Sequence, residues 1–307
     1  MQDLGFKLLS VTEAAALASY KYLGAGNEKE ADRVAVDAMR KSLNSLKING
    51  TVVIGEGERD NAPMLYIGEK VGSGGIDVDI ALDPLEGTTM CAHYKNGAMS
   101  VLAIAKRGGF LNAPDVYMEK IAVGPNVPRD AVSLKYDIKT NLYNLAEVKK
   151  CKVDELVVTV LYRERHLELI KSIRECGAHI KLIDDGDISA VVSLVKGVHD
   201  LYVGIGGAPE GVLAASALLS MGGYMEGKLI FDTEYLKARA EKFGIKDINK
   251  IYSIEEMIKS EAIFVATGIT DSTLVQGIRC SHRSFVMESI IIRPASIMYI
   301  NNTIPEV

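Results

Sequence analysis

This 307-residue sequence has few of the features that mark disulfide-bonded, zinc-binding or membrane proteins. It has no tryptophan and only four cysteines, and no two cysteines have the C-x-x-C spacing of a zinc or thiol-redox site. No apolar run reaches the length of a membrane span, and Met1 is not followed by the basic and apolar segments of a secretory signal. We therefore expect a cytoplasmic protein with no membrane partner. Its cysteines should be free thiols: Cys91, Cys151, Cys176 and Cys280.

The charge balance argues against a nucleic-acid partner. The 35 lysines and arginines are outnumbered by 40 acidic residues, for a net charge of -5, and no basic stripe with interleaved aromatic residues is present. The five histidines show no metal-ligand spacing, which disfavours a zinc hydrolase or a histidine-based phosphatase. The remaining composition is that of an ordinary globular chain, and its length suffices for one large or two medium domains.

The hydrophobic pattern predicts an α+β first half and an α/β second half, divided near Lys150 into 1–150 and 151–307. In the first half, helices are expected from Thr12, as the cap, to Leu23 and over 28–46. A mixed or antiparallel sheet should contain 98–105 and 116–123 as strands joined by a turn. In the second half, alternation of strand and helix predicts a mainly parallel sheet with crossover helices. These are the strands 156–161, 179–183 and 201–205 and the helices 164–176, 188–195 and 209–220.

One apolar run, which begins at Val78, ends in the turn Asp83-Pro84-Leu85-Glu86-Gly87-Thr88. Pro84 fixes its own φ and favours an extended residue before it, and Gly87 permits a backbone direction that other residues resist. The carboxylates of Asp83 and Glu86 can therefore converge and bind a hard ion such as Mg²⁺ or Mn²⁺, with Thr88 beside it. An acidic surface turn is the alternative, since D-P-x-x-G is also ordinary turn chemistry.

A second acidic turn favours the metal interpretation. The segment Gly55-Glu56-Gly57-Glu58-Arg59-Asp60 follows the apolar residues 51–54, in the same order of strand and then glycine-rich acidic loop. A solvated loop rarely needs two glycines around one glutamate, so the two turns together predict a divalent-metal site for phosphoryl chemistry. Asp32, an acidic residue near the start of a predicted helix, stays undecided, because a carboxylate there also interacts favourably with the helix dipole.

In the second half, three polar loops follow predicted strands: 163–166, 184–187 and 204–211. Ligands of open α/β sheets bind beyond the carboxyl ends of strands, so these loops should line one rim. Gly206 and Gly207, just before the helix that starts near Pro209, could present backbone N–H groups to a phosphate. Glu210 is negative at that place, which favours it as a metal ligand.

These segments resemble the class II fructose-1,6-bisphosphatases, a bacterial and archaeal branch of the metal-dependent, lithium-sensitive phosphatase superfamily. The turn 83–88 looks like the superfamily's metal signature, and the stretch from Gly55 to Glu69 is similar to one peculiar to class II. The segments 111–120, 185–187 and 204–211 complete the resemblance, which covers most of the chain. The fold it implies is the layered αβαβα sandwich of sugar phosphatases.

The resemblance implies hydrolysis of the 1-phosphate of fructose-1,6-bisphosphate, giving fructose-6-phosphate and phosphate, with Mn²⁺ or Mg²⁺ as cofactor. Thr88 would orient or activate the attacking water, and Asp60, or else Glu58, is the candidate general base by position. Arg163 and Arg165 suit the phosphate that is not cleaved. The implied metal ligands are Asp32, Glu56, Asp83, Glu86 and Glu210. The implied substrate contacts are Glu86, Gly87, Thr88, Tyr117, Arg163, Glu164, Arg165, Asp185, Gly186, Asp187 and Gly207.

Three alternatives stay open. Sedoheptulose-1,7-bisphosphate could be the substrate, alone or in addition, because it also carries a phosphate at each end. Inositol monophosphate is disfavoured, because a second basic loop would be superfluous, and a non-catalytic sugar-phosphate sensor is disfavoured because no metal carboxylate is lost. The chain departs from the family at Glu28, where a lysine is usual, with Lys29 shifted by one, and in a short C-terminal segment after Arg279. We also expect a homo-oligomer, either a dimer or a tetramer.

Overall fold

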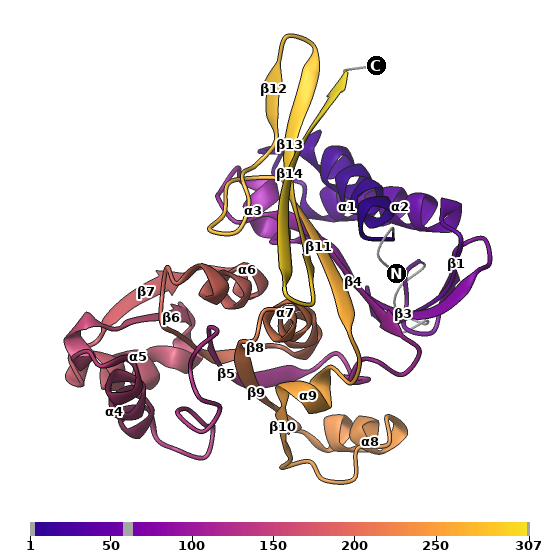
Figure 1. Cartoon of the computed structure of the whole chain (residues 1–307). Helices are drawn as coiled ribbons and strands as arrows, with labels where there is room; N and C mark the ends of the chain where they lie inside the picture. The colour runs from indigo at the N-terminus through magenta and orange to yellow at the C-terminus, as the bar shows by residue number, and fades with distance from the viewer. Residues whose placement is uncertain (1–3, 58–63, 306–307) are drawn as a thin grey trace. The chain divides into compact units, whose positions relative to one another are not determined.

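The computed structural model describes residues 4–57 and 64–305, which form two compact units (Figure 1). Unit 1 contains the chain up to Phe110 and again from Ser260 onward, and unit 2 contains Leu111–Lys259. The compact units therefore do not divide near Lys150, which lies inside unit 2 at the end of α4 (Ile138–Lys149). The reason is strand pairing, because the late strand β11 (Ala262–Gly268) pairs with the early strand β4 (Met99–Lys106) and returns the chain to unit 1.

Unit 1 is a mixed sheet with helices packed on it. The strand order is β12-β13-β11-β4-β3-β1-β2, with β14 on β13, and β1 with β3 is the one parallel pair among the described strands of this sheet. This agrees with the predicted mixed or antiparallel sheet. The strands are β1 Ile48–Ile54, β2 Lys70–Val71, β3 Ile76–Glu86, β4 Met99–Lys106, β11 Ala262–Gly268, β12 Arg279–Ser281, β13 Ser284–Arg293 and β14 Ser296–Pro305, and the helices are α1 Leu4–Tyr20, α2 Glu28–Ser45 and α3 Thr88–Ala92.

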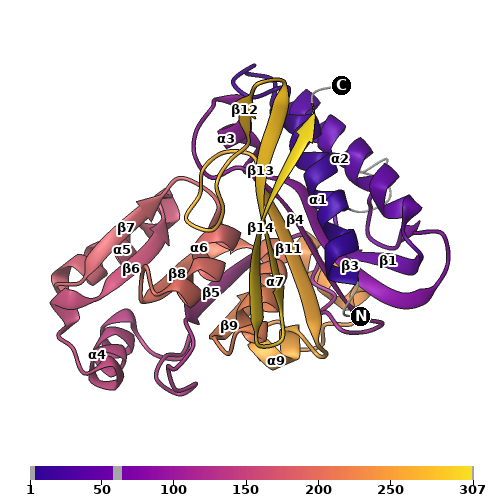
Figure 2. The same cartoon turned by 45° about the horizontal axis from the view of Figure 1, so that its top comes forward.

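The helices α1 and α2 pack against each other, and α1 also packs on β4 and β11 (Figure 2). The predicted cap at Thr12 is wrong, because the helix already begins at Leu4 and Thr12 is buried inside it. Its hydroxyl is 2.8 Å from that of Thr267 on β11, a tertiary contact that occupies the group expected to cap. The second prediction is confirmed: Asn27 caps α2 by accepting from the Glu30 N–H at 3.1 Å, and the helix ends at Ser45.

Unit 2 is a second mixed sheet, with strand order β10-β9-β5-β8-β6-β7. Its strands are β5 Tyr117–Val123, β6 Val157–Leu161, β7 His179–Ile183, β8 Leu201–Gly207, β9 Tyr224–Leu229 and β10 Ile251–Ser253. Besides α4, its helices are α5 Leu167–Glu175, α6 Asp187–Ser193, α7 Ala208–Ser220, α8 Glu234–Lys242 and α9 Ile254–Met257, with 3₁₀ turns at Val153–Glu155, Glu164–His166 and Leu194–Lys196. Over the described ranges of both units, no helix combines the length and the apolar character that a membrane span requires.

The alternation of strand and helix predicted over 156–220 is confirmed, but the sheet is mixed rather than mainly parallel. β6 runs parallel to β7 and β8, whereas β5 runs antiparallel to β8 and β9. The predicted hairpin of 98–105 with 116–123 is wrong, since β4 pairs with β3 and β11 in unit 1 and β5 pairs with strands of unit 2. A glycine-rich turn permits many connections, and both strands find better partners far away in sequence.

A buried aromatic side chain of the unit 1 sheet predicts one large stability effect. Phe264 on β11 is fully buried and stands in register with Ala103 of β4 and Ile292 of β13. Phe264→Ala should lower the free energy of unfolding by about 3–5 kcal/mol, because it removes buried apolar surface and leaves a cavity. Urea unfolding followed by circular dichroism measures this. The matched control is Phe6→Ala, at a side chain 56% exposed, and an equal loss in both variants would contradict the burial of Phe264.

Candidate functional site

The turn that follows β3 brings two carboxylates together. Opposite β4, Asp83 is in register with Val101 and Glu86 with Met99, so three steps on β3 match two on its neighbour. Residues three apart on a regular strand would point to opposite faces, and this irregularity removes that constraint. A carboxylate oxygen of Asp83 and one of Glu86 lie within 4.8 Å of each other. Asp83 Oδ1 also accepts the Leu85 N–H at 3.0 Å, which orients the carboxylate.

Gly87 and Thr88 complete this turn. Gly87 has a φ of 77°, in the left-handed region, and the short helix α3 begins at the next residue. A Cβ at Gly87 would meet Ala98 and Met90 at 3.4 Å, an ordinary van der Waals contact, so it is the backbone conformation that favours glycine. The Thr88 hydroxyl donates to Leu85 O at 3.1 Å and is half-buried, which places it next to Glu86 and Gly87 in a fixed position.

Glu56 and Asp83 lie at the carboxyl ends of two neighbouring strands, at the same end of the sheet. β1 and β3 are parallel neighbours, with Ile54 in register with Ala81, and each acid lies two residues beyond that pair. The Glu56 N–H donates to Leu65 O at 3.1 Å, and a Cβ at Gly55 would lie 2.1 Å from the same oxygen, so this close approach requires glycine. The candidate bases Glu58 and Asp60 lie outside the described residues.

Asp32 lies on α2, a helix that packs against α3 and β3. It is half-buried, and burial raises the pKa of its carboxyl. Glu28 is the first residue of the same helix, and its Oε1 is 3.8 Å from His93 Nε2. Burial of the Asp32 carboxyl disfavours its charged form unless a nearby cation compensates for the lost water.

The oxygen donors of unit 1 fit a hard divalent cation. Asp83 and Glu86 are held on a rigid turn, and Glu86 is only 5% exposed, so both are ordered before any ligand binds. Carboxylate oxygens with room for water and phosphate oxygens are the donor set of Mg²⁺ and Mn²⁺ rather than of zinc. The pair of carboxylates could therefore bind a divalent metal ion.

The predicted ligand Glu210 belongs to unit 2, in the first turn of α7. The backbone before it differs from the sequence prediction of a phosphate loop, because Gly206 and Gly207 are part of β8, in register with Met118 and Tyr117. A Cβ at Gly207 would lie 1.7 Å from Glu210 Oε2, so the glycine makes room for that carboxylate. The space beside Gly207 is therefore occupied by an acid.

The three polar loops of unit 2 share one rim, as predicted, since β6, β7 and β8 run parallel as neighbours. The Arg165 guanidinium ties two of these loops together by donating to Ile205 O from Nε at 3.1 Å and from an Nη at 2.7 Å. It also lies 4.8 Å from the ring centroid of Tyr117. These contacts fix its plane and leave three of its five N–H donors for a ligand. Arg163 is half-buried and donates to Tyr162 O at 3.1 Å.

A buried ion pair joins Lys120 of β5 to Asp187 at the start of α6. Lys120 Nζ also donates to Gly207 O at 3.0 Å, and the Tyr202 hydroxyl lies 3.4 Å from Asp187 Oδ2. The predicted contact Asp187 is therefore engaged within the protein. Sequence reasoning assigned no role to Lys120, although a lysine inside an apolar strand was the signal. The neighbouring Asp185 accepts the Gly186 N–H at 3.0 Å, and its pKa is raised by burial.

His166 fixes the loop that carries the two arginines. It is 1% exposed; its Nδ1–H donates to Leu161 O at 2.7 Å, and its Nε2 accepts the Ile205 N–H at 2.7 Å. These two bonds require the neutral ring, and burial lowers the pKa of His166 below its ordinary 6.5.

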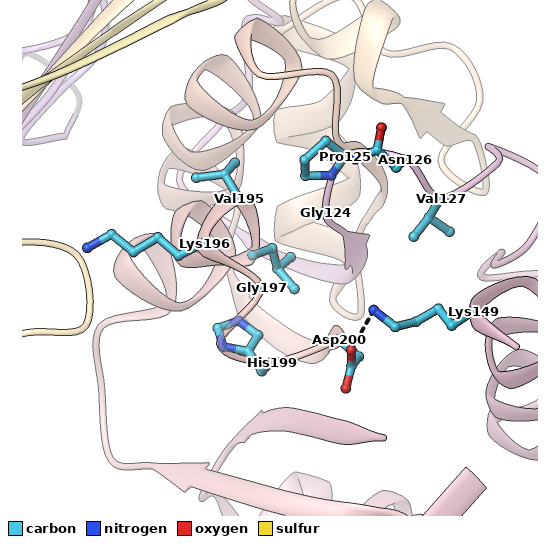
Figure 3. A pocket seen from close by; sticks show the side chains of 11 residues that line it. Gly124, Pro125, Asn126, Val127, Lys149, Val195, Lys196, Gly197, His199 and Asp200 are labelled. Atoms are coloured by element: carbon cyan, nitrogen blue, oxygen red, sulfur yellow. Dashed lines mark ion pairs between the residues drawn. The ribbon is translucent and has the colours of Figure 1, made fainter. Parts of the chain in front are cut away.

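A separate cavity of about 250 Å³ lies at the other end of β5 and β8 (Figure 3). There Val123 is in register with Leu201, whereas Tyr117 and Gly207 mark the end near the polar loops. Lys149 points across the cavity to Asp200, with 2.7 Å between Nζ and Oδ1. His199 lines the wall, and its Nε2–H donates to Ala190 O at 2.8 Å. This cavity is therefore distinct from the predicted substrate loops.

The buried, neutral ring of His166 predicts how the stability of the protein depends on pH. Because the folded protein binds a proton at His166 more weakly than the unfolded chain, this contribution to stability is complete above pH 6.5 and decreases as the pH falls below it. His166→Gln should therefore lose less stability than the wild type between pH 7 and pH 5.5 in urea unfolding. Replacement of the exposed His179 by Gln is the control. An unchanged dependence in His166→Gln would contradict the neutral ring.

Comparison with known proteins places these features in one family. The profile described as "Bacterial fructose-1,6-bisphosphatase, glpX-encoded" matches residues 2–303. A "D-fructose 1,6-bisphosphatase class 2/sedoheptulose 1,7-bisphosphatase" from Synechococcus sp. (strain JA-3-3Ab) is 44% identical over 90% of this chain and 87% of its own. A protein of the same name from Crocosphaera subtropica is 42% identical over 95% of this chain and 93% of its own length. An inositol monophosphatase structure from Anabaena covers 73% of this chain and 90% of its own at a TM-score of 0.38 and 12% identity, too weak a likeness for an argument. The chain belongs to the family of class II bacterial fructose-1,6-bisphosphatases.

Proposed function

We propose that this protein hydrolyses the 1-phosphate of fructose-1,6-bisphosphate, giving fructose-6-phosphate and phosphate. The observation that carries the proposal is the paired carboxylates of Asp83 and Glu86, followed directly by the Thr88 hydroxyl, on a rigid turn of a chain that belongs to this family. Sedoheptulose-1,7-bisphosphate is a second candidate substrate, because the relatives are named for both activities.

We propose a divalent ion, Mn²⁺ or Mg²⁺, as the cofactor. Its ligands would be Asp83 and Glu86 of the turn after β3, together with Glu56 at the end of the neighbouring strand β1. The resemblance to the family adds Asp32 and Glu210 as proposed ligands. When bound, such an ion would polarise the phosphoryl oxygens and lower the pKa of water. The protein contributes a preorganised set of carboxylates that accept no proton from the reaction at neutral pH, since their ligand role requires the ionised form.

Thr88 is proposed to orient the attacking water. A threonine hydroxyl is too weak an acid to act alone, so a carboxylate must accept the proton that the water loses. Asp60 remains the proposed general base, with Glu58 as the alternative, since both follow Glu56 in sequence. The bond from Thr88 Oγ1 to Leu85 O holds the hydroxyl oxygen in place, so its lone pairs can accept a hydrogen bond from water.

The loops of unit 2 are proposed to bind the phosphate that stays on the sugar. Arg165 is preorganised by Tyr117 and by Ile205 O, and a fixed guanidinium loses little freedom when it binds a phosphate. Arg163 supplies a second positive charge from the same loop. Asp187 is proposed to act through the ion pair with Lys120, which holds the start of α6. The other proposed contacts are Glu86, Gly87, Glu164, Asp185, Gly186 and Gly207.

Phosphate release from the purified, metal-stripped protein tests the function. The substrates to compare are fructose-1,6-bisphosphate, sedoheptulose-1,7-bisphosphate and inositol monophosphate, each titrated with Mg²⁺ and with Mn²⁺. We expect turnover of the first, and turnover of the second at a similar rate would make the enzyme bifunctional. Binding of both bisphosphates without release of phosphate would identify a sensor and overturn the proposal.

The metal site predicts a loss of both binding and turnover in Asp83→Asn. Removal of one ligand charge should weaken Mn²⁺ binding at least about tenfold and lower the turnover number at least about 100-fold, with little change in the unfolding midpoint. Calorimetric titration with Mn²⁺ measures the first effect, and phosphate release measures the second. Asp77→Asn, an exposed acid at the other end of β3, is the matched control. Full activity of Asp83→Asn in excess metal would remove Asp83 from the site.

The arginines predict a selective effect on bisphosphates. Arg163→Ala with Arg165→Ala should lower the catalytic efficiency on fructose-1,6-bisphosphate about 100-fold, because charged hydrogen bonds to the retained phosphate are lost. The efficiency on fructose-1-phosphate, which lacks that phosphate, should change less than about threefold. The control is Arg174→Ala, an exposed arginine at the end of α5. A proportional fall on both substrates would assign the two arginines to the reacting end or to the fold.

A further inference from the structure

The strand β14 forms one edge of the unit 1 sheet. It pairs with β13 over ten consecutive residues, from Ser296 to Pro305, without a register shift. Within residues 4–57 and 64–305, β13 is the one strand that pairs with it. Its outer edge therefore presents backbone donors and acceptors along a length of about 33 Å, at about 3.3 Å per residue.

Natural edge strands are usually short, charged or interrupted, because an open edge otherwise pairs with another chain. The edges at the other ends of the described sheets follow this rule: β2 has two residues, one of them lysine, β10 has three, and β7 contains Lys181. β14 has ten residues, Ser-Ile-Met-Tyr-Ile-Asn-Asn-Thr-Ile-Pro, with no charge, and its one proline is the last residue. It is thus an edge without protection.

The two faces of β14 differ. Met298, Ile300 and Ile304 pack against the unit 1 core, and Asn302 Nδ2 donates to Glu13 Oε2 of α1 at 3.0 Å. The alternate residues Tyr299, Asn301 and Thr303 are exposed. Since one face is already committed to the core, a strand added at this edge would extend the existing sheet.

We propose that β14 pairs with β14 of a second copy of this chain, antiparallel and about a two-fold axis, so that two unit 1 sheets become one. Identical strands that meet in this way place each residue opposite one from the same segment. A strand with charges of one sign would then oppose like charges, which is destabilising, whereas the uncharged β14 does not. The absence of charge therefore fits a second copy, whereas an acidic or basic partner would gain nothing from it.

The faces also fix the register. Residues directly opposite each other project to the same side of a sheet, so the two-fold axis must pass through one residue rather than between two. Ile300 and Asn301 are the central choices. An axis at Asn301 places Tyr299 of one copy opposite Thr303 of the other, an aromatic and β-branched pair of the favourable kind, and Asn301 opposite itself, where two amides can exchange hydrogen bonds.

Sedimentation velocity on the full chain tests the interface. Tyr299→Lys with Thr303→Lys would place four lysines in two opposed pairs, so the mass of the assembly should fall by half and the dissociation constant should rise at least tenfold. The control adds two lysines at other exposed apolar positions of unit 1, Phe6→Lys with Ile76→Lys, and should keep the wild-type mass. Mixing the double-lysine variant with Tyr299→Glu and Thr303→Glu should restore the assembly. A monomeric wild type, or an unchanged mass in the double-lysine variant, would overturn the proposal.

A cross-linking variant tests the register without perturbing the charge. On the axis, Asn301→Cys would face itself at a Cα separation of about 4.5–5.5 Å, which allows a disulfide. We expect a covalent dimer on non-reducing gels after mild oxidation, above the background of wild-type Cys280. Tyr299→Cys would face Thr303 and should give only that background. Equal cross-linking of the two variants, or none in Asn301→Cys, would exclude the pairing centred on Asn301.

Discussion

The irregular end of β3 is the constraint on which the proposed chemistry depends. A regular strand would separate the carboxylates of Asp83 and Glu86 onto opposite faces, and the extra step against β4 brings their oxygens within 4.8 Å. β3 lies between β1 and β4 in the interior of the unit 1 sheet, so the turn is held on both sides. The neighbouring β1 then delivers Glu56 to the same edge, and the left-handed Gly87 directs the chain into α3 with Thr88 at its start.

Unit 2 positions its polar loops by different means. Its carboxylate Asp187 is buried and paired with Lys120, and removal of either partner would leave a buried charge that costs several kcal/mol. His166 and Arg165 both bond to the backbone of Ile205, which ties the loop after β6 to the end of β8. The polar loops of unit 2 are thus held in part by side chains that are buried, paired or bonded to the backbone of a neighbouring loop. Such rigidity reduces the entropy lost when a phosphate binds.

The division into units shows how a sheet recruits distant segments. The chain leaves unit 1 after Phe110 and returns at Ser260, because β11 completes the sheet between β4 and β13. The last strand, β14, then forms an edge that combines ten residues with no charge, whereas β2 and β7 each contain a lysine and β10 has only three residues. The C-terminal segment therefore forms part of the unit 1 sheet and is the candidate contact surface for a second copy.

The sequence by itself determined the family, the strand and helix pattern from 156 to 220, and the turn at 83–88, because these depend on local periodicity and on specific turn residues. The tertiary structure decided the rest. It separated β4 from β5, since neither turn chemistry nor propensity reveals a partner that lies 78 residues or more away in sequence. It also buried Lys120 against Asp187 and made Thr12 an interior residue of α1, because both depend on which faces meet when the sheets assemble.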